Sequence, residues 1–496
     1  MSIKSFLAKP FAGVVSKQVQ KWSAEAGRAQ EFVFQKLIQQ GKNTAFGKEH
    51  GFDSIHSHQD FAAQVPVRDY EQLSNWIEKI KAGEENILWK GKPLYFAKTS
   101  GTTSGVKYIP ITRDSIPNHI NTTRNALLMY LHQTGNSHFI DGKMIFLSGS
   151  PEMESTNGIL TGRLSGIVNH HVPKYLRGNQ LPSFETNCIE EWETKVARIV
   201  EETQYEDLRL VSGIPPWIQM YFDLLLEKTG KKNVLEVFPN LSLLVYGGVN
   251  FEPYREKLFR TIGKEIDSVE TYPASEGFIA FQEEQPGKGL LLNVDSGIFF
   301  EFIAAEDVSK ENPARLTIDE VELGKNYALV LSNNAGLWAY LIGDTIKFVS
   351  LAPHRIVVTG RVKHFISAFG EHVIAEEVET ALMSVAKKHN IAVTEFHVAP
   401  NVNPADGGKP FHEWFVEFDS APADLKIFSR EVDLHMRELN IYYRDLLEGN
   451  ILRPLVMHAL PKNSFIDYMK SKGKLGGQNK VPRLANDCSL AAELLR

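Results

Sequence analysis

A glycine-rich loop near residue 100 brings together the first side chains suited to chemistry. Residues 98–110 read Lys-Thr-Ser-Gly-Thr-Thr-Ser-Gly-Val-Lys-Tyr-Ile-Pro. Glycines let the backbone turn tightly and expose N–H groups to an anion, while the hydroxyls and Lys107 add further donors for phosphate. The loop lacks the Gly-Lys-[Ser/Thr] ending of a Walker loop, which disfavours a P-loop kinase or ATPase. A polar hairpin turn has the same composition, so the loop alone leaves phosphate binding open.

Two acidic residues follow in short motifs of their own. Residues 271–277 read Thr-Tyr-Pro-Ala-Ser-Glu-Gly, and residues 340–344 read Tyr-Leu-Ile-Gly-Asp. Mg²⁺ prefers one or two carboxylates together with substrate phosphates, which Glu276 would suit. An acid at the end of a strand, such as Asp344, is a natural acceptor for ribose hydroxyls. The alternatives are a surface turn with a solvated Glu276 and a tight turn capped by Asp344.

One lysine near the C-terminus stands in a loop rich in glycine, glutamine and asparagine. Residues 478–483 read Gln-Asn-Lys-Val-Pro-Arg, with Lys480 at their centre. A single lysine in such a loop is usually solvated. Only the presence of the other motifs in the same chain suggests that Lys480 has a functional role.

The elements that must position these residues are read from hydrophobic periodicity. Between residues 94 and 360 short apolar runs alternate with helical patterns, which argues for an α/β body with a parallel or mixed sheet. The predicted strands and helices of this body are 144–147, 208–211, 214–229, 243–246, 252–263, 298–303, 328–331 and 355–358.

After residue 360 the pattern changes to that of a small α+β domain. Its predicted elements are 375–388, 392–398, 413–418, 423–439, 452–459 and 464–472. The join lies within 361–370, and we divide the chain into an N-terminal domain, 1–363, and a C-terminal domain, 364–496, that moves relative to it.

Composition is that of a soluble globular protein. Of 496 residues, 43% are hydrophobic and 23% are charged, with a net charge of −6 that leaves no electrostatic footprint for nucleic acid. No apolar run approaches the ~18 residues of a membrane span. The two cysteines, Cys188 and Cys488, fit a reducing compartment. With no secretory signal, we expect the protein in the cytoplasm.

The N-terminus needs separate treatment, because residues 1–22 carry four lysines and no acid. Their apolar residues recur at helical spacing and include Phe11, Val14, Val15 and Val19. A transit peptide or a membrane-surface helix is one interpretation. We favour a helix packed on the domain with its lysines in water, followed by a second helix over 23–41 that Gly41 caps.

Taken in order, these motifs resemble the adenylate-forming superfamily, and within it the auxin-responsive (Gretchen Hagen) acyl acid–amido synthetases. The segments that carry the resemblance are 99–110, 272–276, 334–344, 440–444 and 465–483. The chain departs from the family pattern in three places. The glycine loop has Thr-Thr-Ser where Thr-Ser-Gly is frequent, Leu341 replaces an arginine, and His364 replaces an acidic hinge residue.

The resemblance implies a large adenylate-forming domain with mixed sheets, a smaller C-terminal domain and a role for each motif. Glu276 would hold Mg²⁺ and Lys480 would act on the α-phosphate and the substrate carboxylate, so both are expected to be catalytic. The residues expected to bind ATP or AMP are Ser100, Gly101, Thr102, Thr103, Ser104, Lys107, Gly248, Val249, Tyr272, Ser275, Asp344 and Arg361.

The implied reaction is ATP-dependent and has two halves. A carboxylic acid is adenylated to acyl-AMP, and the acyl group then passes to an amine, expected to be an amino acid. The walls of the acyl pocket are sought in 115–131 and 212–217, although core packing explains both segments equally well. An acyl-CoA ligase is the alternative enzyme, since residues 360–363 and 369–371 also resemble the thioester-forming branch. A non-catalytic nucleotide-binding protein is the alternative class, and the oligomeric state stays open.

Overall fold

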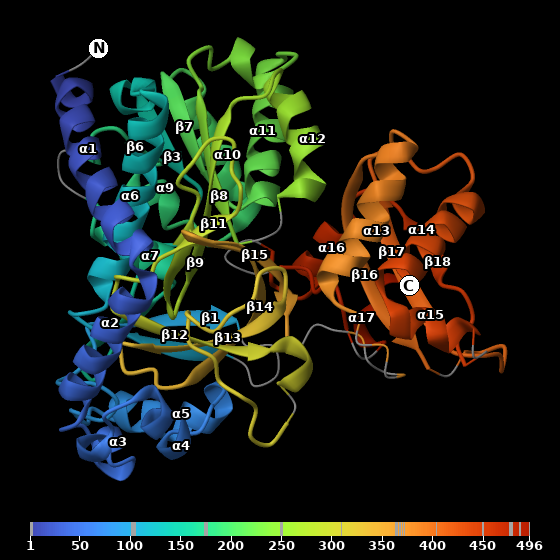
Figure 1. Ribbon diagram of the computed structural model, residues 1–496. Helices are drawn as coiled ribbons and strands as arrows, with labels where there is room; N and C mark the ends of the chain where they lie inside the picture. The colour runs from blue at the N-terminus through green and yellow to red at the C-terminus, as the bar shows by residue number, and fades with distance from the viewer. Residues whose placement is uncertain are drawn as a thin grey trace. The chain divides into compact units, whose positions relative to one another are not determined.

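The computed structural model divides into two compact units, which are described separately (Figure 1). The larger comprises Met1–Val249 and Phe259–Val357, and the smaller comprises Asn250–Leu258 and Val358–Arg496. The residues that the structure describes are 3–100, 106–172, 177–248, 251–308, 310–362, 366, 369, 371, 373–402, 404–448, 451–475, 480–485 and 488–495.

A mixed eleven-stranded sheet forms the centre of the larger unit. Its strand order is β12-β13-β14-β15-β11-β10-β9-β8-β7-β3-β6, with parallel pairing from β6 to β9. The strands are β3 (Lys143–Phe146), β6 (Gln180–Leu181), β7 (Leu208–Gly213), β8 (Leu243–Gly247), β9 (Asp267–Ala274), β10 (Gly277–Phe281), β11 (Leu290–Leu292), β12 (Ile298–Ala304), β13 (Asn326–Asn333), β14 (Tyr340–Leu351) and β15 (His354–Arg361). The strands predicted from short apolar runs are all confirmed, as is the mixed sheet.

A second sheet of four strands carries the glycine-rich loop. Its order is β2-β1-β5-β4, and the strands are β1 (Tyr95–Ser100), β2 (Val106–Ile111), β4 (Glu154–Thr156) and β5 (Ile159–Gly162). Because β1 and β2 pair antiparallel with Ser100 opposite Val106, the loop joins the two strands of a hairpin. The sequence did not predict this sheet.

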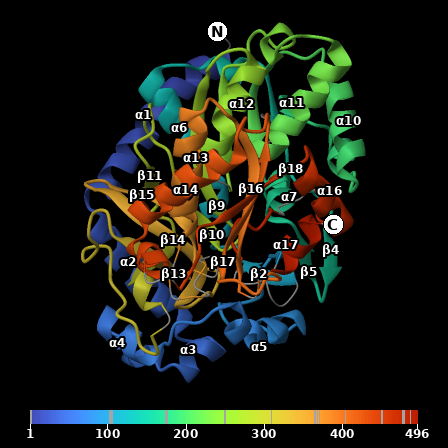
Figure 2. The ribbon, with the colours of Figure 1, turned by 90° about the vertical axis from the view of Figure 1, so that its right-hand side faces the viewer.

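Helices cover both faces of the large sheet. Figures 1 and 2 show α1 and α6 on one side of the parallel strands and α10 and α11 on the other. The helices are α1 (Ile3–Ala24), α2 (Ala26–Gly41), α3 (Ala45–Glu49), α4 (His58–Gln64), α5 (Tyr70–Lys81), α6 (Ile116–Thr134), α7 (Leu164–His170), α9 (Phe184–Asn187), α10 (Trp192–Thr203), α11 (Pro215–Thr229) and α12 (Glu252–Ile262). Local sequence explains where two of these helices begin. A capping box of Asp69 and Gln72 starts α5, and Pro215 is the first residue of α11. No described helix is long and apolar enough to cross a membrane.

The smaller unit is a three-stranded sheet with helices on both faces (Figure 2). Trp414 and Val416 face a core shared with α13 and α14, whereas Phe415, on the alternate face, packs with residues of α16 and α17. Its elements are α13 (Ala375–Lys388), β16 (Val393–Asn401), β17 (Phe411–Phe418), α14 (Leu425–Leu439), α15 (Ile441–Glu448), β18 (Val456–Leu460), α16 (Ser464–Ser471) and α17 (Ser489–Leu494). The predicted α+β arrangement after residue 360 is confirmed.

Two predictions about the N-terminal helices need correction. Helix α2 ends at Gly41 as predicted, but Gly41 is no left-handed cap, because Lys42 continues in right-handed geometry. A glycine stands there because a Cβ atom would lie 2.6 Å from the Trp338 ring. The single apolar face expected for α1 is also wrong: Val15 and Val19 are buried, whereas Phe11 and Val14 are exposed.

Candidate active site

Glu276 stands at the tip of a tight hairpin. Ala274 of β9 pairs with Gly277 of β10, so Ser275 and Glu276 form a two-residue turn in which Ser275 is buried and Glu276 is half-buried. A Cβ atom on Gly277 would lie 2.4 Å from Cδ1 at the end of the Ile298 side chain, so the turn approaches β12 closely. The turn is thereby held against β12 rather than projecting freely into water.

The carboxylate of Glu276 accepts a hydrogen bond from the hydroxyl of Tyr340, the first residue of β14. Burial, and then the charge of Glu276 and this hydrogen bond, raise the pKa of Tyr340 well above its usual value, so the hydroxyl stays protonated and donates. The side-chain amide of Asn333 donates to the backbone carbonyl of Glu276 at 2.7 Å. Two neighbouring strands therefore fix both the backbone and the side chain of Glu276.

Asp344 lies in a bulge of β14 and accepts a hydrogen bond from Tyr272, which belongs to the predicted site. Leu341 pairs with Val330 and Thr345 with Ala328, so residues 342–344 stand opposite one residue of β13. The hydroxyl of Tyr272 donates to Oδ2 of Asp344 at 2.5 Å. The structure therefore brings together two residues, from separate motifs, that the sequence assigned to adenine and ribose.

Gly248 follows the carboxyl end of β8, beside the strand that carries Tyr272. Gly247 pairs with Thr271 in parallel register, and Thr271 Oγ1 donates to the carbonyl of Tyr246 at 2.9 Å. A Cβ atom on Gly247 would lie 2.2 Å from the carbonyl oxygen of Thr271, which explains the glycine. In open α/β sheets, ligands bind at the carboxyl ends of parallel strands, and this is such an edge.

Lys107 occupies β2 directly opposite Thr99. Its ammonium lies 5.5 Å from the ring centroid of Tyr70, within range of a cation–π contact. The hydroxyl of Tyr70 accepts a hydrogen bond from the backbone N–H of Tyr108 at 2.8 Å, which ties the start of α5 to the hairpin. The side chain of Ser100 and residues 101–105 lie outside the described part, and with them Gly101, Thr102, Thr103 and Ser104; Val249 lies outside it as well.

Arg361 and Lys480 belong to the smaller unit, where both are exposed. Arg361 ends β15. The segment after Lys480 is anchored by Arg483, which pairs with Glu395 at 3.0 Å and with Glu379, while its carbonyl accepts from the N–H of Val398. The chain three residues beyond the predicted catalytic lysine is thus fixed to β16.

No group of three or more His, Cys, Asp or Glu able to hold a metal occurs among the residues that the structure describes. A Mg²⁺ ion held by one carboxylate and substrate phosphates needs no such group. The half-buried, oriented carboxylate of Glu276 fits that coordination.

Sequence reasoning missed three residues that shape this region. Tyr340 belongs to the motif 340–344, but no role was assigned to it. Its position four residues before Asp344 could have pointed to one. Asn333 directly precedes the Asn-Ala-Gly-Leu segment 334–337. Tyr70 lies in no motif, and no sequence feature indicated a role for it.

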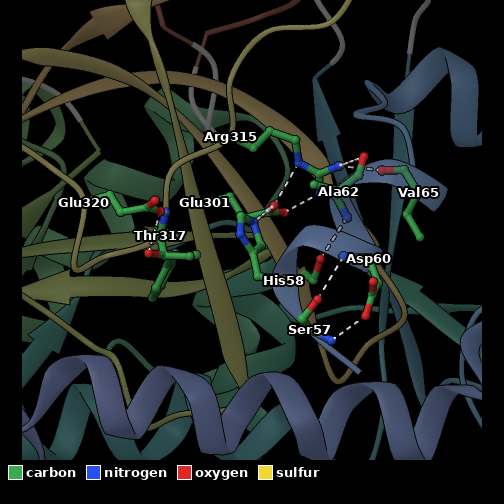
Figure 3. Close-up of polar contacts among 12 residues, drawn as sticks. Ser57, His58, Asp60, Ala62, Val65, Glu301, Arg315, Thr317 and Glu320 are labelled. Atoms are coloured by element: carbon green, nitrogen blue, oxygen red, sulfur yellow. Dashed lines mark hydrogen bonds and ion pairs between the residues drawn. The ribbon is translucent and has the colours of Figure 1, made fainter. Parts of the chain in front are cut away.

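A second carboxylate of the larger unit, that of Glu301, is held by different partners from Glu276 (Figure 3). Glu301 of β12 is fully buried and accepts two hydrogen bonds from Arg315, at 2.8 and 2.7 Å, and its Oε1 lies 2.7 Å from Nε2 of His58. Burial would raise the pKa of Glu301, but the contacts with His58 and Arg315 outweigh it and lower that pKa. Arg315 also donates to carbonyls of Ala62 and Val65, so this cluster fastens α4 and the segment after it to the sheet.

The fold is that of the adenylate-forming enzymes, as the comparison with solved structures shows. The GH3.15 acyl acid amido synthetase matches with a TM-score of 0.79 over 98% of this chain and 96% of that chain, at 14% identity. A 2-hydroxyisobutyryl-CoA ligase in the postadenylation state matches with a TM-score of 0.57 over 97% and 92%, at 13% identity. The predicted fold class is confirmed.

Within that class the chain belongs to the GH3 family, as its sequence motifs predicted. The GH3 family N-terminal domain matches residues 15–186, the central domain 291–361 and the C-terminal domain 376–489. Among curated relatives, a jasmonoyl–L-amino acid synthetase of Nicotiana attenuata is 22% identical over 96% of this chain and 94% of its own length. An indole-3-acetic acid-amido synthetase of Arabidopsis thaliana is 21% identical, over 92% and 88%.

Proposed function

We propose that this protein is an AMP-forming acyl acid–amido synthetase. It adenylates a small carboxylic acid with ATP, releasing pyrophosphate, and then transfers the acyl group to the amine of an amino acid, releasing AMP. The observation that carries the proposal is the pairing of Glu276, in the turn between β9 and β10, with Tyr340, and of Asp344, in the bulge of β14, with Tyr272. Membership of a family whose named relatives conjugate acids to amino acids supports it.

Positioning and charge compensation dominate the first half-reaction, since a carboxylate is a weak nucleophile and ATP is itself anionic. We assign Ser100, Lys107 and the loop between them to the phosphates and Asp344 to the ribose. Tyr272 and Gly248 would flank the adenine, with Ser275 beside them. Mg²⁺ held at Glu276 would supply positive charge against the phosphate oxygens.

The C-terminal domain, 364–496, would bring Lys480 to the α-phosphate and the substrate carboxylate, with Arg361 near the ribose. Motion of this domain would then control entry of the acceptor and exclude water from the acyl-AMP anhydride. We place the enzyme in the cytoplasm, where ATP and free amino acids are available.

The second half-reaction requires the amine as its free base, because a protonated amine has no lone pair for the acyl carbon. The α-amine of an amino acid has a pKa near ~8, so only a modest shift is needed at neutral pH. A CoA ligase would instead require a groove for the pantetheine arm. The names of the curated relatives favour the amine.

Pyrophosphate exchange with a panel of carboxylic acids tests the first half-reaction. We expect AMP and pyrophosphate as products, and Lys480→Ala should slow exchange by ~10²–10³-fold while ATP still binds, as for loss of one preorganised charge. Formation of ADP and phosphate would eliminate adenylation. Mass spectrometry of a reaction with mixed amino acids should then detect an N-acyl amino acid, whereas acyl-CoA formed in a parallel CoA reaction, with no amide, would identify the thioester-forming alternative.

A further inference from the structure

Helix α1 carries both buried and exposed apolar residues. Its inner face buries Ala12, Val15 and Val19 in a core shared with α6. Figure 1 shows α1 at the edge of the larger unit with α6 on its inner side. This packing accounts for one apolar face and leaves the other unexplained.

The outer face exposes four large apolar side chains within two and a half turns. The exposed fractions are 70% for Phe6, 60% for Leu7, 47% for Phe11 and 54% for Val14. At about 100° per residue, these four span an arc of about 140°, which adjoins the arc of Val15 and Val19. Single exposed apolar residues need no explanation, but a contiguous stripe of this kind marks an interaction site. We call these four residues the α1 stripe.

Charge around the α1 stripe is strongly biased. Residues 1–22 contain four lysines and no acid, although the whole chain carries a net charge of −6. Lys9, Lys17 and Lys21 are exposed on α1. A second copy of the chain would bring these lysines against their own counterparts, so self-association through this face is electrostatically disfavoured.

We propose that α1 docks the protein on the surface of an anionic lipid bilayer. The α1 stripe would enter the boundary between headgroups and acyl chains while Lys9, Lys17 and Lys21 lie among anionic headgroups, as in helices that lie in the membrane plane. Docking of this kind uses the outer face and keeps the contact with α6. It is independent of the proposed ligase activity.

Co-sedimentation of the full-length protein with vesicles tests this docking. We expect binding to phosphatidylcholine vesicles that contain phosphatidylserine, weak binding to vesicles of phosphatidylcholine alone, and loss of binding as salt is raised. These measurements use the unaltered protein, so they do not depend on the folding of any variant. Failure to bind the anionic vesicles at low salt would overturn the proposal.

Matched variants locate the surface. Phe6→Ser with Phe11→Ser should weaken binding at least about tenfold, since burying even one such ring is worth more than that factor. Phe184→Ser, at a phenylalanine of α9 that is 52% exposed, should bind as the unaltered protein does. Equal loss in both, or none in either, would contradict a role for the α1 stripe.

Charge reversal separates the lipid from a protein occupant. Lys9→Glu with Lys17→Glu should abolish the preference for anionic vesicles, whereas Lys231→Glu with Lys232→Glu, at exposed lysines elsewhere in the larger unit, should keep it. Light scattering provides the remaining test. A dimer that Phe11→Ser dissociates would show that the α1 stripe is a self-interface and would overturn lipid docking.

Discussion

Three buried or half-buried acids of the larger unit, Glu301, Glu276 and Asp344, are each held in place, but by different kinds of partner. Glu301 is held by the guanidinium of Arg315, which cancels its charge, and the pair is closed off from solvent. Glu276 accepts from a tyrosine hydroxyl, and Asp344 does the same with Tyr272. A hydroxyl orients a carboxylate without neutralising it. Glu301 therefore fastens the chain, whereas we propose that Glu276 and Asp344 are oriented to receive a ligand.

The largest expected effect comes from breaking the fastening pair. Glu301→Gln leaves Arg315 buried beside a neutral group, which should lower the free energy of unfolding by about 3–5 kcal/mol. Urea denaturation measures the change. The control is Glu322→Gln, which removes an exposed pair with Lys325 and should leave the free energy of unfolding nearly unchanged. Equal costs for the two variants would contradict the structural role given to Glu301.

Glu276→Gln should give the opposite result to Glu301→Gln. The amide keeps the shape of the side chain and removes the charge, so we expect pyrophosphate exchange to fall by ~10²-fold or more while the denaturation midpoint barely moves. Stopped assays of exchange, read beside the urea curve of the same preparation, separate the two effects. A large loss of stability with normal exchange would assign Glu276 to structure instead.

A smaller effect is expected when only the orienting hydroxyl is removed. Tyr340→Phe leaves Glu276 charged but less firmly oriented. Exchange should fall by roughly 10-fold, the lower end of what one hydrogen bond to a charged group contributes. Tyr130→Phe removes a comparable hydroxyl–carboxylate contact, to Asp267 at 2.6 Å, outside the proposed site. Exchange that drops equally in both variants would mean that the loss is general.

The smallest effect is a dependence of stability on pH. The pKa of Glu301 is lower in the folded protein than its usual value of 4.5, so the unfolded chain binds the proton more readily. The stabilising contribution is therefore complete above the unfolded pKa and is lost as pH falls through the folded one. The difference in unfolding free energy between the unaltered protein and Glu301→Gln should shrink over that range. A difference that stays constant there would show that Glu301 does not titrate as described.

The sequence predicted the elements of this fold better than the contacts between them. Residues 208–211 and 243–246 are short apolar runs between turn residues, and such local signals suffice to identify strands. The partnership of Glu276 with Tyr340 joins residues 64 positions apart in different hairpins, and periodicity carries no information about it. Gly41 shows the same limit, since its position was predicted from helix-end chemistry whereas its cause is the ring of Trp338.

For the predicted site, the sequence likewise indicated residues but not their contacts. Tyr272 and Asp344 were each chosen from a motif, yet nothing local indicated that one donates to the other. Their contact depends on the extra residues of β14, which no local pattern marks, because a bulge is defined by the partner strand. Family resemblance found the residues, and only the three-dimensional structure shows how they are aimed.

The bulge at residues 342–344 also bears on how this protein would respond to engineering. Two residues fewer in β14 would restore regular pairing with β13 and return hydrogen bonds to the ladder, so a selection for heat tolerance would favour the shorter strand. The same deletion would remove or turn away Asp344. Thermostable variants of this enzyme should therefore be sought in surface loops and helix ends, because the bulge of β14 orients Asp344 at the expense of stability.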